Sequence, residues 1–514
     1  MNIAKATAEP RSLAGQTLWL MTAKGIALFL ALVLPLILVR RLDPEQLGLY
    51  RQAFQILTTT LALLCLQVSA TAYYFTPREP ERKSQVALNV LIFYLGIGLA
   101  VMVLFVSFPR WVRPVFNGDG LIPVVPLIGA TILLWIIAQN LDSVMIANGD
   151  IRWSSGLTVI VQLLKTSLLI GAAVIGGTVK AIMIAALITG IVHCGISVIY
   201  LKRRFGRFWQ GFDWPLFKAQ LGNALPFGIG GLAYIVQFDL HNYYVSHHFS
   251  PAEFAVYSIG CFQLPMLQVL IESVEAVLLS EVTRLEKDGA HQRIFQLWTN
   301  SMRMLAFAFF PICAMLFVLR HEFILTLFTA NYAAATPIFA VNLINILLYV
   351  FLVGTVLRAL PELRFFRVKF CLFLLPLTFF ALYAGIRWGG LVGAITAVAL
   401  TRLFDAIVTM VVVGRRLGVT RQDLWRFAPL GRQALASIIA ALATVFVRFA
   451  MGPRPVQIVL VACSLVFGAS YLISLFVSGA VTNEDQTMLR GFWQKISQFG
   501  MVRIVPSSPT DVQS

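Results

Sequence analysis

The sequence predicts an all-α integral membrane protein with about fourteen transmembrane helices. Of its 514 residues, 59% are hydrophobic and 12% are charged, whereas an ordinary soluble domain is about 45–50% apolar and about 25% charged. The apolar residues occur in runs of bilayer length, and the basic residues gather in alternate loops between these runs. A soluble fold could not cover this much apolar surface.

The predicted spans have the roughly 20 residues that a helix needs to cross the hydrocarbon core. The first apolar run follows a polar start and continues to Val39, which is too long for the core of a signal peptide. We therefore expect an uncleaved first helix. The predicted spans are residues 13–39, 49–75, 86–108, 121–147, 154–176, 179–200, 219–246, 254–279, 294–319, 336–358, 368–386, 389–413, 432–450 and 456–480.

Positively charged residues mark one side of the predicted membrane. With the N-terminus inside, most of the 40 Lys and Arg residues fall in segments on the inner side, and cytoplasmic loops of membrane proteins are enriched in these residues. We therefore expect a multi-pass membrane protein with cytoplasmic N- and C-termini. The net charge of +17 then reports topology and does not indicate nucleic-acid binding.

An internal repeat predicts the domain organisation. Residues 41–50 (RLDPEQLGLY) follow the first predicted span, and residues 248–257 (HFSPAEFAVY) follow the seventh, on the same side of the membrane. Such a repeat is typical of two parallel six-helix lobes that hold cargo between them. We expect an N-terminal lobe, a cytoplasmic amphipathic linker, a C-terminal lobe, two additional transmembrane helices and a cytoplasmic tail at residues 1–206, 207–218, 219–416, 431–480 and 481–514.

Charged side chains inside the spans are the candidate functional residues, because each costs about 2.5–3.5 kcal/mol to insert. At about 1.5 Å per residue, Lys24 and Lys165 lie near the middle of their spans and Arg303 is slightly shallower. No partner for these cations is evident in the sequence. A water-filled cavity that they line would suit a cargo carrying phosphate or diphosphate. Alternatively, each side chain reaches the membrane surface or makes one interhelical contact.

Four more charged residues complete the candidate set. Arg51, near the start of the second span, is either a fourth substrate-binding residue or an outer rim residue. Asp239 lies toward the outer end of the seventh span. Arg402 and Asp405, three residues apart in the twelfth span, can share a face and neutralise one another. These last three are candidates for gating or coupling.

Enzyme and metal motifs are missing from the sequence. It has no glycine-rich phosphate loop, no HExxH motif and no loop that brings Ser, His and Asp together. Its six cysteines are isolated in apolar runs, as buried small side chains are. The pair His247 and His248 has no evident third ligand. We therefore expect no enzymatic activity, no cofactor and no metal ion.

Two segments carry a resemblance to known proteins. The opening helix runs into residues 38–50 (LVRRLDPEQLGLY), and residues 237–257 (QFDLHNYYVSHHFSPAEFAVY) place an aspartate late in the seventh span before a short loop and a tyrosine. In these features the chain resembles the polysaccharide transporter (Wzx-type oligosaccharide flippase) family of the MOP superfamily. That superfamily also includes MurJ lipid II flippases and MATE exporters.

The resemblance implies a flippase that moves polyprenyl-diphosphate-linked oligosaccharide repeat units from the cytoplasmic to the periplasmic leaflet by alternating access. The product would serve O-antigen, capsule or exopolysaccharide synthesis, and the resemblance places the protein in the bacterial inner (cytoplasmic) membrane. It also implies a basic central cavity, which Lys24, Arg51, Lys165 and Arg303 could serve, with Lys24 and Arg303 holding the diphosphate. MurJ-like proteins have an arginine in the first helix where this chain has Lys24, which argues mildly against lipid II as the cargo.

Partners and alternatives follow from the same reading. We expect a monomer that contacts the lipid-linked oligosaccharide, membrane lipids and the polymerase and glycosyltransferases of its pathway, but no nucleic acid. A MATE-like multidrug or cation exporter is an alternative that would need acidic groups at mid-depth and typically has twelve helices. A membrane polymerase or ligase of glycan assembly would need a large outer loop or a catalytic cluster, whereas the predicted outer loops are short.

Overall fold

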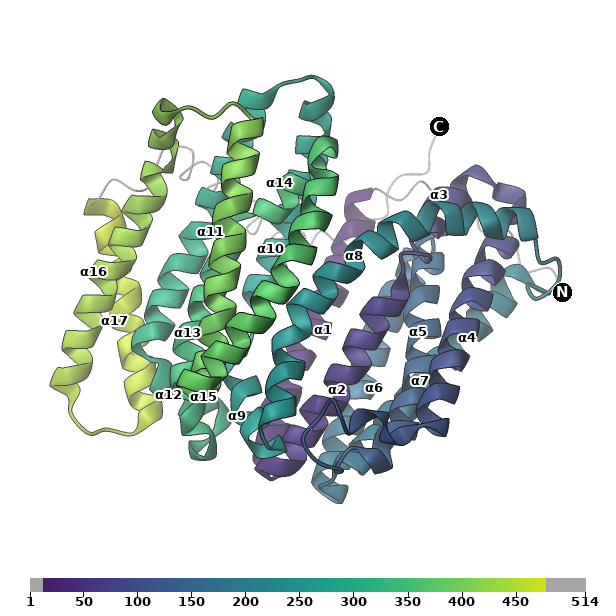
Figure 1. Ribbon diagram of the computed structural model, residues 1–514, viewed down its shortest axis with the longest axis horizontal. Helices are drawn as coiled ribbons and strands as arrows, with labels where there is room; N and C mark the ends of the chain where they lie inside the picture. The colour runs from purple at the N-terminus through teal and green to yellow at the C-terminus, as the bar shows by residue number, and fades with distance from the viewer. Residues whose placement is uncertain (1–12, 478–514) are drawn as a thin grey trace, which may run out of the picture.

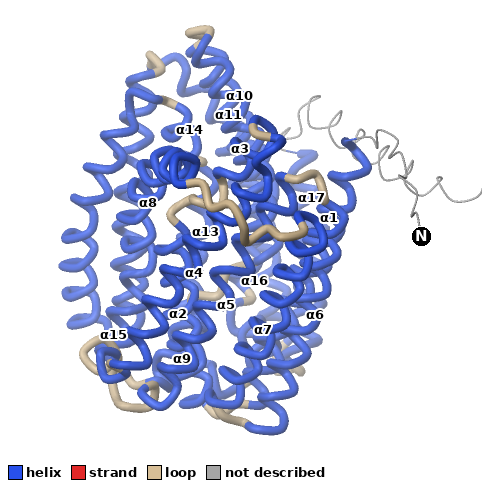
Figure 2. Tube along the Cα trace, turned by 90° about the vertical axis from the view of Figure 1, so that its right-hand side faces the viewer, coloured by secondary structure: helices blue, strands red, loops and turns tan. Residues whose placement is uncertain are grey.

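The computed structural model describes residues 13–477, and the side chains of residues 13–24, 227, 230, 364, 424 and 476 lie outside its description. The predicted tail at 481–514 also lies outside the described residues. The described chain forms helices and contains no strand, as Figure 1 shows. In the side view of Figure 2, long helices run next to each other from one end of the molecule to the other. The predicted fold class is confirmed.

The first lobe, defined here as α1 to α7, forms one half of the molecule (Figure 1). Inside it α4 packs on α5, α1 on α6, and α5 on α7. Its elements are α1 (Leu13–Arg41), α2 (Pro44–Cys65), α3 (Thr71–Arg78), η1 (Pro80–Arg82), α4 (Lys83–Ser107), η2 (Pro109–Val112), η3 (Ile122–Val124), α5 (Val125–Ala147), α6 (Ile151–Gly176) and α7 (Val179–Phe205).

The second lobe, defined here as α8 to α15, follows the same general order of long helices. Inside it α8 packs on α15, α13 on α15, and α10 on α11. Its elements are α8 (Trp214–His248), α9 (Pro251–Gly260), α10 (Pro265–Lys287), α11 (His291–Val318), α12 (Arg320–Phe328), η4 (Ala330–Ala335), α13 (Thr336–Leu348), η5 (Tyr349–Phe351), α14 (Val353–Ala359), η6 (Pro361–Leu363) and α15 (Arg364–Arg416).

The element α15 is a hairpin of two antiparallel arms. Gly390 has a φ of 56°, in the left-handed region that glycine adopts at little cost, and the chain reverses there. Gly385 and Gly393 lie so close across the turn that neither has room for a β-carbon. Arg367 and Asp405 form an ion pair of 2.7 Å, although a straight helix would hold them about 57 Å apart. The two arms correspond to the predicted spans 368–386 and 389–413.

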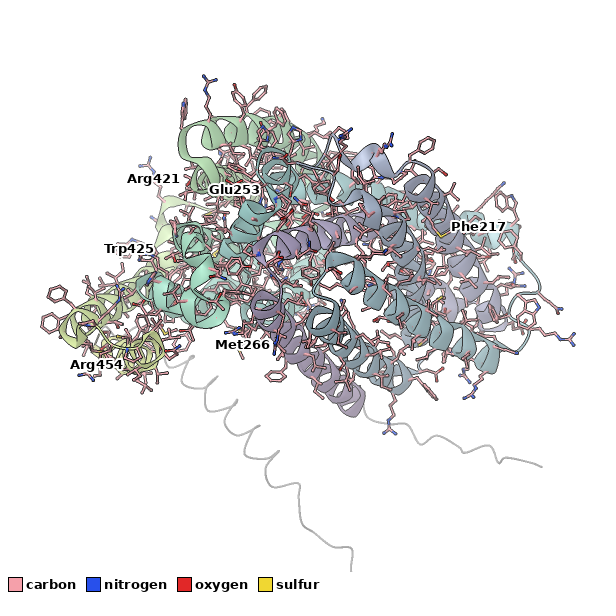
Figure 3. The ribbon with its side chains drawn as sticks, turned by 90° about the horizontal axis from the view of Figure 1, so that it is seen from below. Phe217, Glu253, Met266, Arg421, Trp425 and Arg454 are labelled. Atoms are coloured by element: carbon pink, nitrogen blue, oxygen red, sulfur yellow. The ribbon has the colours of Figure 1, made fainter. Side chains whose placement is uncertain are left out.

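Two further helices pack on the outside of the second lobe. After η7 (Arg421–Phe427), α16 (Ala428–Met451) packs on α11, and α17 (Val456–Val477) contacts α12. Arg448 of α16 forms an ion pair of 2.7 Å with Glu322 of α12, whose side chain is only 7% exposed. Seen from below in Figure 3, Arg454 in the turn between α16 and α17 lies at one edge of the molecule.

The number of membrane-crossing helices depends on how the bent helices are counted. Within residues 13–477, nine helices are long and apolar enough to cross a membrane, or up to eleven if each of two bent pairs is one span. The bent pairs are the two halves of α8, at 51°, and α9 with α10, at 56°. Every predicted span overlaps a helix, but α1 and α2 are not among these candidates and α15 counts once. The total of fourteen therefore stays a prediction, as do the predicted domain limits.

The two copies of the sequence repeat meet where the lobes touch. Each copy starts a helix with proline at its first position, after an N-cap residue whose side chain accepts a backbone hydrogen bond: Asp43 before α2 and Ser250 before α9. The two helices pack together, and a β-carbon at Gly48 would overlap the carbonyl of Pro251. The repeat therefore supplies both sides of one contact between the lobes.

Candidate functional site

A cavity of about 390 Å³ lies between the lobes, close to the contact between α2 and α9. One wall is α2 of the first lobe, and the other walls come from α8, α9, α13 and the second arm of α15. Arg51 is seven residues after the start of α2, which places it about 10 Å along that helix. The cavity is therefore recessed from the end of the molecule where the lobes meet.

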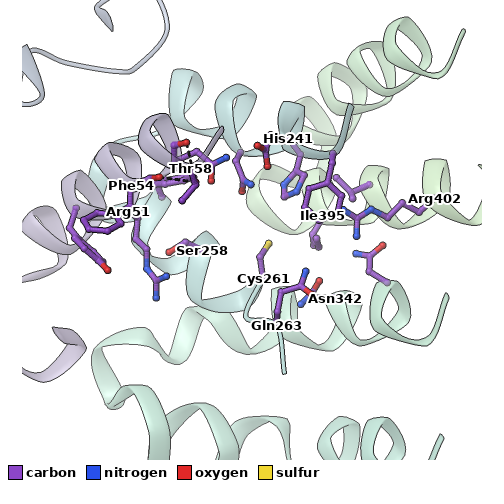
Figure 4. Close-up of a pocket in the computed structure, with 18 residues that line it drawn as sticks. Arg51, Phe54, Thr58, His241, Ser258, Cys261, Gln263, Asn342, Ile395 and Arg402 are labelled. Atoms are coloured by element: carbon purple, nitrogen blue, oxygen red, sulfur yellow. Dashed lines mark hydrogen bonds between the residues drawn. The ribbon is translucent and has the colours of Figure 1, made fainter. Parts of the chain in front are cut away.

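Two arginines, one from each lobe, face the cavity. In Figure 4, Arg51 and Arg402 lie on opposite sides, with Cys261 and Gln263 between them. Arg402 stacks over the ring of Phe238 at 4.7 Å. Among the described residues, neither arginine has a carboxylate oxygen within ion-pair distance. The positive charge of both guanidinium groups is therefore available to an anion in the cavity.

The carboxylate of Asp239 also lines the cavity, but it is engaged in a contact between the lobes. The Thr59 hydroxyl on α2 donates to Asp239 Oδ2 on α8 at 2.5 Å. Gln55 donates to the same hydroxyl oxygen at 2.9 Å, and the Tyr243 hydroxyl donates to the Gln55 carbonyl at 3.4 Å. Asp239 therefore joins α8 to α2.

A buried histidine supports the wall next to Asp239. His241 and Tyr257 are 7% and 0% exposed, and His241 Nδ1 lies 2.9 Å from the Tyr257 hydroxyl. Tyr257 is the last residue of the second repeat copy, and its counterpart Tyr50 lines the same cavity from α2. The repeat thus places Tyr50 in the cavity lining and Tyr257 next to the lining residue His241.

Amide side chains make up most of the uncharged polar lining. The Asn342 amide donates to the Phe262 carbonyl at 3.2 Å. Asn345 is only 2% exposed, and neither polar atom of its side chain has a hydrogen-bond partner among the described residues. A buried amide without a partner is costly, so this position needs a ligand group, a water molecule or a rearrangement to satisfy it. The amides that line the cavity are Gln55, Asn242, Gln263, Asn342 and Asn345.

The structure brings only some of the predicted site residues together. Arg51, Asp239 and Arg402 share the cavity, so Arg51 is a cavity residue and not one of the outer rim. The expected neutralisation of Arg402 by Asp405 is wrong, because Asp405 pairs with Arg367 on the other arm of α15. A helix hairpin offered Asp405 a partner that spacing along one helix could not show.

The remaining predicted cations lie outside this cavity. Lys165 on α6 places its ammonium 4.5 Å from the ring centre of Trp135. That ring lies edge-on to Phe54, a residue of the cavity wall, so Lys165 lies behind the wall. Arg303 is half-buried on α11 and does not line the cavity. Lys24 lies on α1, but its side chain is outside the described residues.

The amides of α13 are cavity residues that the pattern of ionisable residues in the spans does not indicate. Asn342 and Asn345 are three residues apart in an apolar run, so they share one face of α13. Polar residues at that spacing in a predicted span were a usable signal. No group of three or more His, Cys, Asp or Glu side chains that could hold a metal ion occurs within the described part of the chain.

Comparison with solved structures identifies the fold. The lipid II flippase MurJ in an inward closed conformation aligns with a TM-score of 0.67 at 14% identity, over 89% of this chain and 98% of that one. A multidrug resistance MATE family transporter of the MOP superfamily aligns with a TM-score of 0.53 at 15% identity, over 78% of this chain and 95% of that one. A MOP superfamily transporter from Pyrococcus furiosus aligns with a TM-score of 0.52 at 15% identity, over 79% and 94%.

The sequence matches a family model but no curated protein. The family model described as polysaccharide biosynthesis protein matches residues 78–337, which is half of the chain and runs from the end of α3 into α13. The family and the fold agree with the predicted resemblance to the MOP superfamily and not with an enzyme. The chain belongs to the polysaccharide biosynthesis protein family and has the fold of MOP-superfamily transporters.

Proposed function

We propose that the protein is a flippase that moves polyprenyl-diphosphate-linked oligosaccharide repeat units across the membrane by alternating access. The observation that carries this proposal is the inter-lobe cavity, which Arg51 and Arg402 line from opposite sides without carboxylate partners among the described residues. Both arginines are half-buried, and cations that are partly removed from bulk solvent need an anion or water to offset the cost. A cargo with two linked phosphates brings the matching charge.

The chemistry of both arginines suits a diphosphate. A guanidinium group presents several donors in a planar fork that matches phosphate oxygens and stays charged at any physiological pH. Because one arginine belongs to each lobe, a diphosphate between them would contact both halves of the transporter. This assignment moves the principal phosphate contacts from Lys24 and Arg303, which the resemblance implied, to Arg51 and Arg402.

The uncharged lining suits the oligosaccharide. Amide and hydroxyl groups donate and accept hydrogen bonds, as sugar hydroxyls do, and the cavity offers five amides together with Thr58 and Ser258. A cavity of about 390 Å³ holds only part of an oligosaccharide. The proposed cargo therefore places its diphosphate and first sugar here, with the other sugars outside this cavity.

The other predicted residues keep subsidiary roles in this proposal. Lys165 adds positive potential from behind the wall that Phe54 forms. Lys24 and Arg303 serve the cargo elsewhere on its path. Asp239 and the Arg367–Asp405 pair take part in gating or coupling, because Asp239 joins α2 to α8 and the pair joins the two arms of α15.

The distribution of basic residues over the loops supports the proposed orientation in the membrane. We propose the bacterial inner membrane, cytoplasmic termini, a monomeric transporter and transport from the cytoplasmic to the periplasmic leaflet for surface polysaccharide synthesis. The lobes then meet at the periplasmic end, since the repeat segments follow spans that leave the cytoplasm. Glycosyltransferases would supply the cargo and a polymerase would consume it.

The charge of the cavity lining argues against the MATE-like alternative. An exporter of cationic drugs needs acidic groups that face the cargo, because opposite charges attract. Here the described cavity carries two arginines against one carboxylate, and that carboxylate already accepts a hydrogen bond from Thr59. A polymerase or ligase is disfavoured by membership of the transporter fold.

The test uses proteoliposomes and a fluorescent polyprenyl-diphosphate-linked oligosaccharide, whose arrival in the outer leaflet is read by quenching. Arg51→Glu and Arg402→Glu should each lower the rate at least tenfold, because a negative charge replaces a phosphate contact. Arg387→Glu is the matched control, since Arg387 is on α15 but does not line the cavity. Unchanged rates for both cavity variants at normal protein levels would reject the proposal.

A further inference from the structure

A contact between the lobes that lies outside the cavity involves Arg40, the next to last residue of α1. Its guanidinium donates to the carbonyls of Thr326 and Leu327 at 2.9 and 2.8 Å. Both carbonyls belong to the last turn of α12, in the other lobe. The same guanidinium also donates to the Leu36 carbonyl at 2.6 Å, which fixes it on its own helix.

The chemistry of this contact is that of a helix cap supplied from another part of the chain. The last four carbonyls of a helix have no partner within it, and the C-terminal end carries partial negative charge. A cation that donates hydrogen bonds there is favourable on both counts. Arg40 therefore stabilises α12 only while the two lobes are together at this end.

A second contact at this end is related to the first by the sequence repeat. The backbone N–H of Asn117, in the loop after α4, donates to the carbonyl of Ser246 near the end of α8 at 3.0 Å. In both contacts the end of the first long helix of one lobe meets the segment after the third long helix of the other. The two contacts thus repeat around the axis that relates the lobes.

The two related contacts differ in strength. The contact at Ser246 is one backbone hydrogen bond, whereas Arg40 makes two charge-assisted bonds across the interface. Hydrogen bonds from charged donors are the stronger kind. The counterpart of Arg40 in the second repeat is His247, for which the described residues offer no hydrogen bond to the other lobe. Arg40 is therefore the principal polar link of this closure outside the cavity.

We propose that Arg40 is the latch that holds the lobes closed at the end where α2 and α9 begin. This inference rests on the proposed alternating access, in which that end must open to release cargo. Opening withdraws the guanidinium from the two α12 carbonyls, and water takes its place. The strength of the latch sets the fraction of empty transporters that are open at this end.

The experiment measures the separation of the lobes without cargo. Spin labels on Glu45→Cys of α2 and Asn331→Cys of η4, both exposed positions on opposite lobes, report distances by pulsed electron resonance in lipid nanodiscs. The background lacks the six native cysteines. Arg40→Gln should add a longer distance and raise the open-to-closed ratio about tenfold. Arg41→Gln is the control, because this exposed neighbour makes no hydrogen bond or ion pair with the described residues.

Each outcome decides the question. Equal distance distributions for Arg40→Gln and Arg41→Gln would overturn the latch. If Arg40→Gln does not fold, Arg40→Lys gives the same decision, because it keeps the charge but cannot reach both carbonyls. A lysine variant with the distribution of the control also overturns the inference. A different result is that the unsubstituted protein fails to transport the polyprenyl-diphosphate-linked oligosaccharide in proteoliposomes while Arg40→Gln still changes the distance between the labels. That result would reject the proposed cargo and leave the latch standing.

Discussion

Gly48 of α2 lies directly against the Pro251 carbonyl of α9, with no room for a β-carbon between them. Both residues belong to the sequence repeat, so the two lobes touch through equivalent segments. We expect Gly48→Ala to force these helices apart and destabilise the closed interface by about 1–3 kcal/mol, the usual cost of overpacking.

The measurement is the same distance between labels at positions 45 and 331, together with thermal unfolding in nanodiscs. Gly96→Ala is the control, because a β-carbon at Gly96 meets no atom within 4 Å. A Gly48 variant that unfolds at the same temperature as the control and keeps the short distance would contradict the close packing.

The docking of α16 and α17 depends on the ion pair between Glu322 and Arg448. Arg448→Ala leaves a carboxylate that is only 7% exposed without its partner. Breaking a buried pair costs about 3–5 kcal/mol, and the loss here should be smaller because Arg448 is 43% exposed. The double variant Glu322→Gln with Arg448→Ala should recover most of the loss in thermal unfolding. Arg432→Ala, on an exposed part of the same helix, should have little effect.

Asn345 should distinguish a glycan-bearing cargo from the bare lipid. Its amide has no hydrogen-bond partner among the described residues and belongs to the cavity wall. Replacement by leucine keeps the size but removes the hydrogen bonds, which should weaken binding of a polyprenyl-diphosphate-linked sugar about tenfold. Binding of polyprenyl diphosphate alone should not change. Equal effects on both lipids, measured by the shift in unfolding temperature, would show that Asn345 does not contact the sugar.

Lys165 should matter less for transport than Arg51. Its ammonium is held over Trp135 behind the cavity wall, so in the proposed mechanism it acts on the cargo through the electric potential and without direct contact. We expect Lys165→Gln to lower the flipping rate several-fold less than Arg51→Gln. A Lys165 variant as inactive as the Arg51 variant would place this ammonium in contact with cargo during the cycle.

The helices were predictable because apolar runs of bilayer length can be read directly from the sequence. Even the two arms of α15 were separated correctly, since the Gly-rich break near Gly390 interrupts the hydrophobic pattern. The breaks inside spans were harder to see. The bend of α8 follows Pro226, and the break between α9 and α10 falls just before Pro265. Both prolines lie inside a single predicted span, so the length of the apolar run did not reveal either break.

The candidate site was predictable only in part, because depth along a helix says nothing about the direction in which a side chain points. Lys165 and Arg51 looked similar as buried cations, yet Arg51 faces the cavity and Lys165 lies behind it. The pairing of Asp405 with Arg367 depends on the antiparallel fold of α15. Asn345 carries no charge, so the pattern of ionisable residues within the spans does not indicate it.

The division of the two cavity arginines between separate halves of the chain ties affinity to shape. In the proposed alternating access, the distance between the guanidinium groups grows when the halves move apart, and the proposed diphosphate loses contact with one of them. In that proposal, affinity for the anion falls in the same movement that opens its exit, so release needs no separate signal.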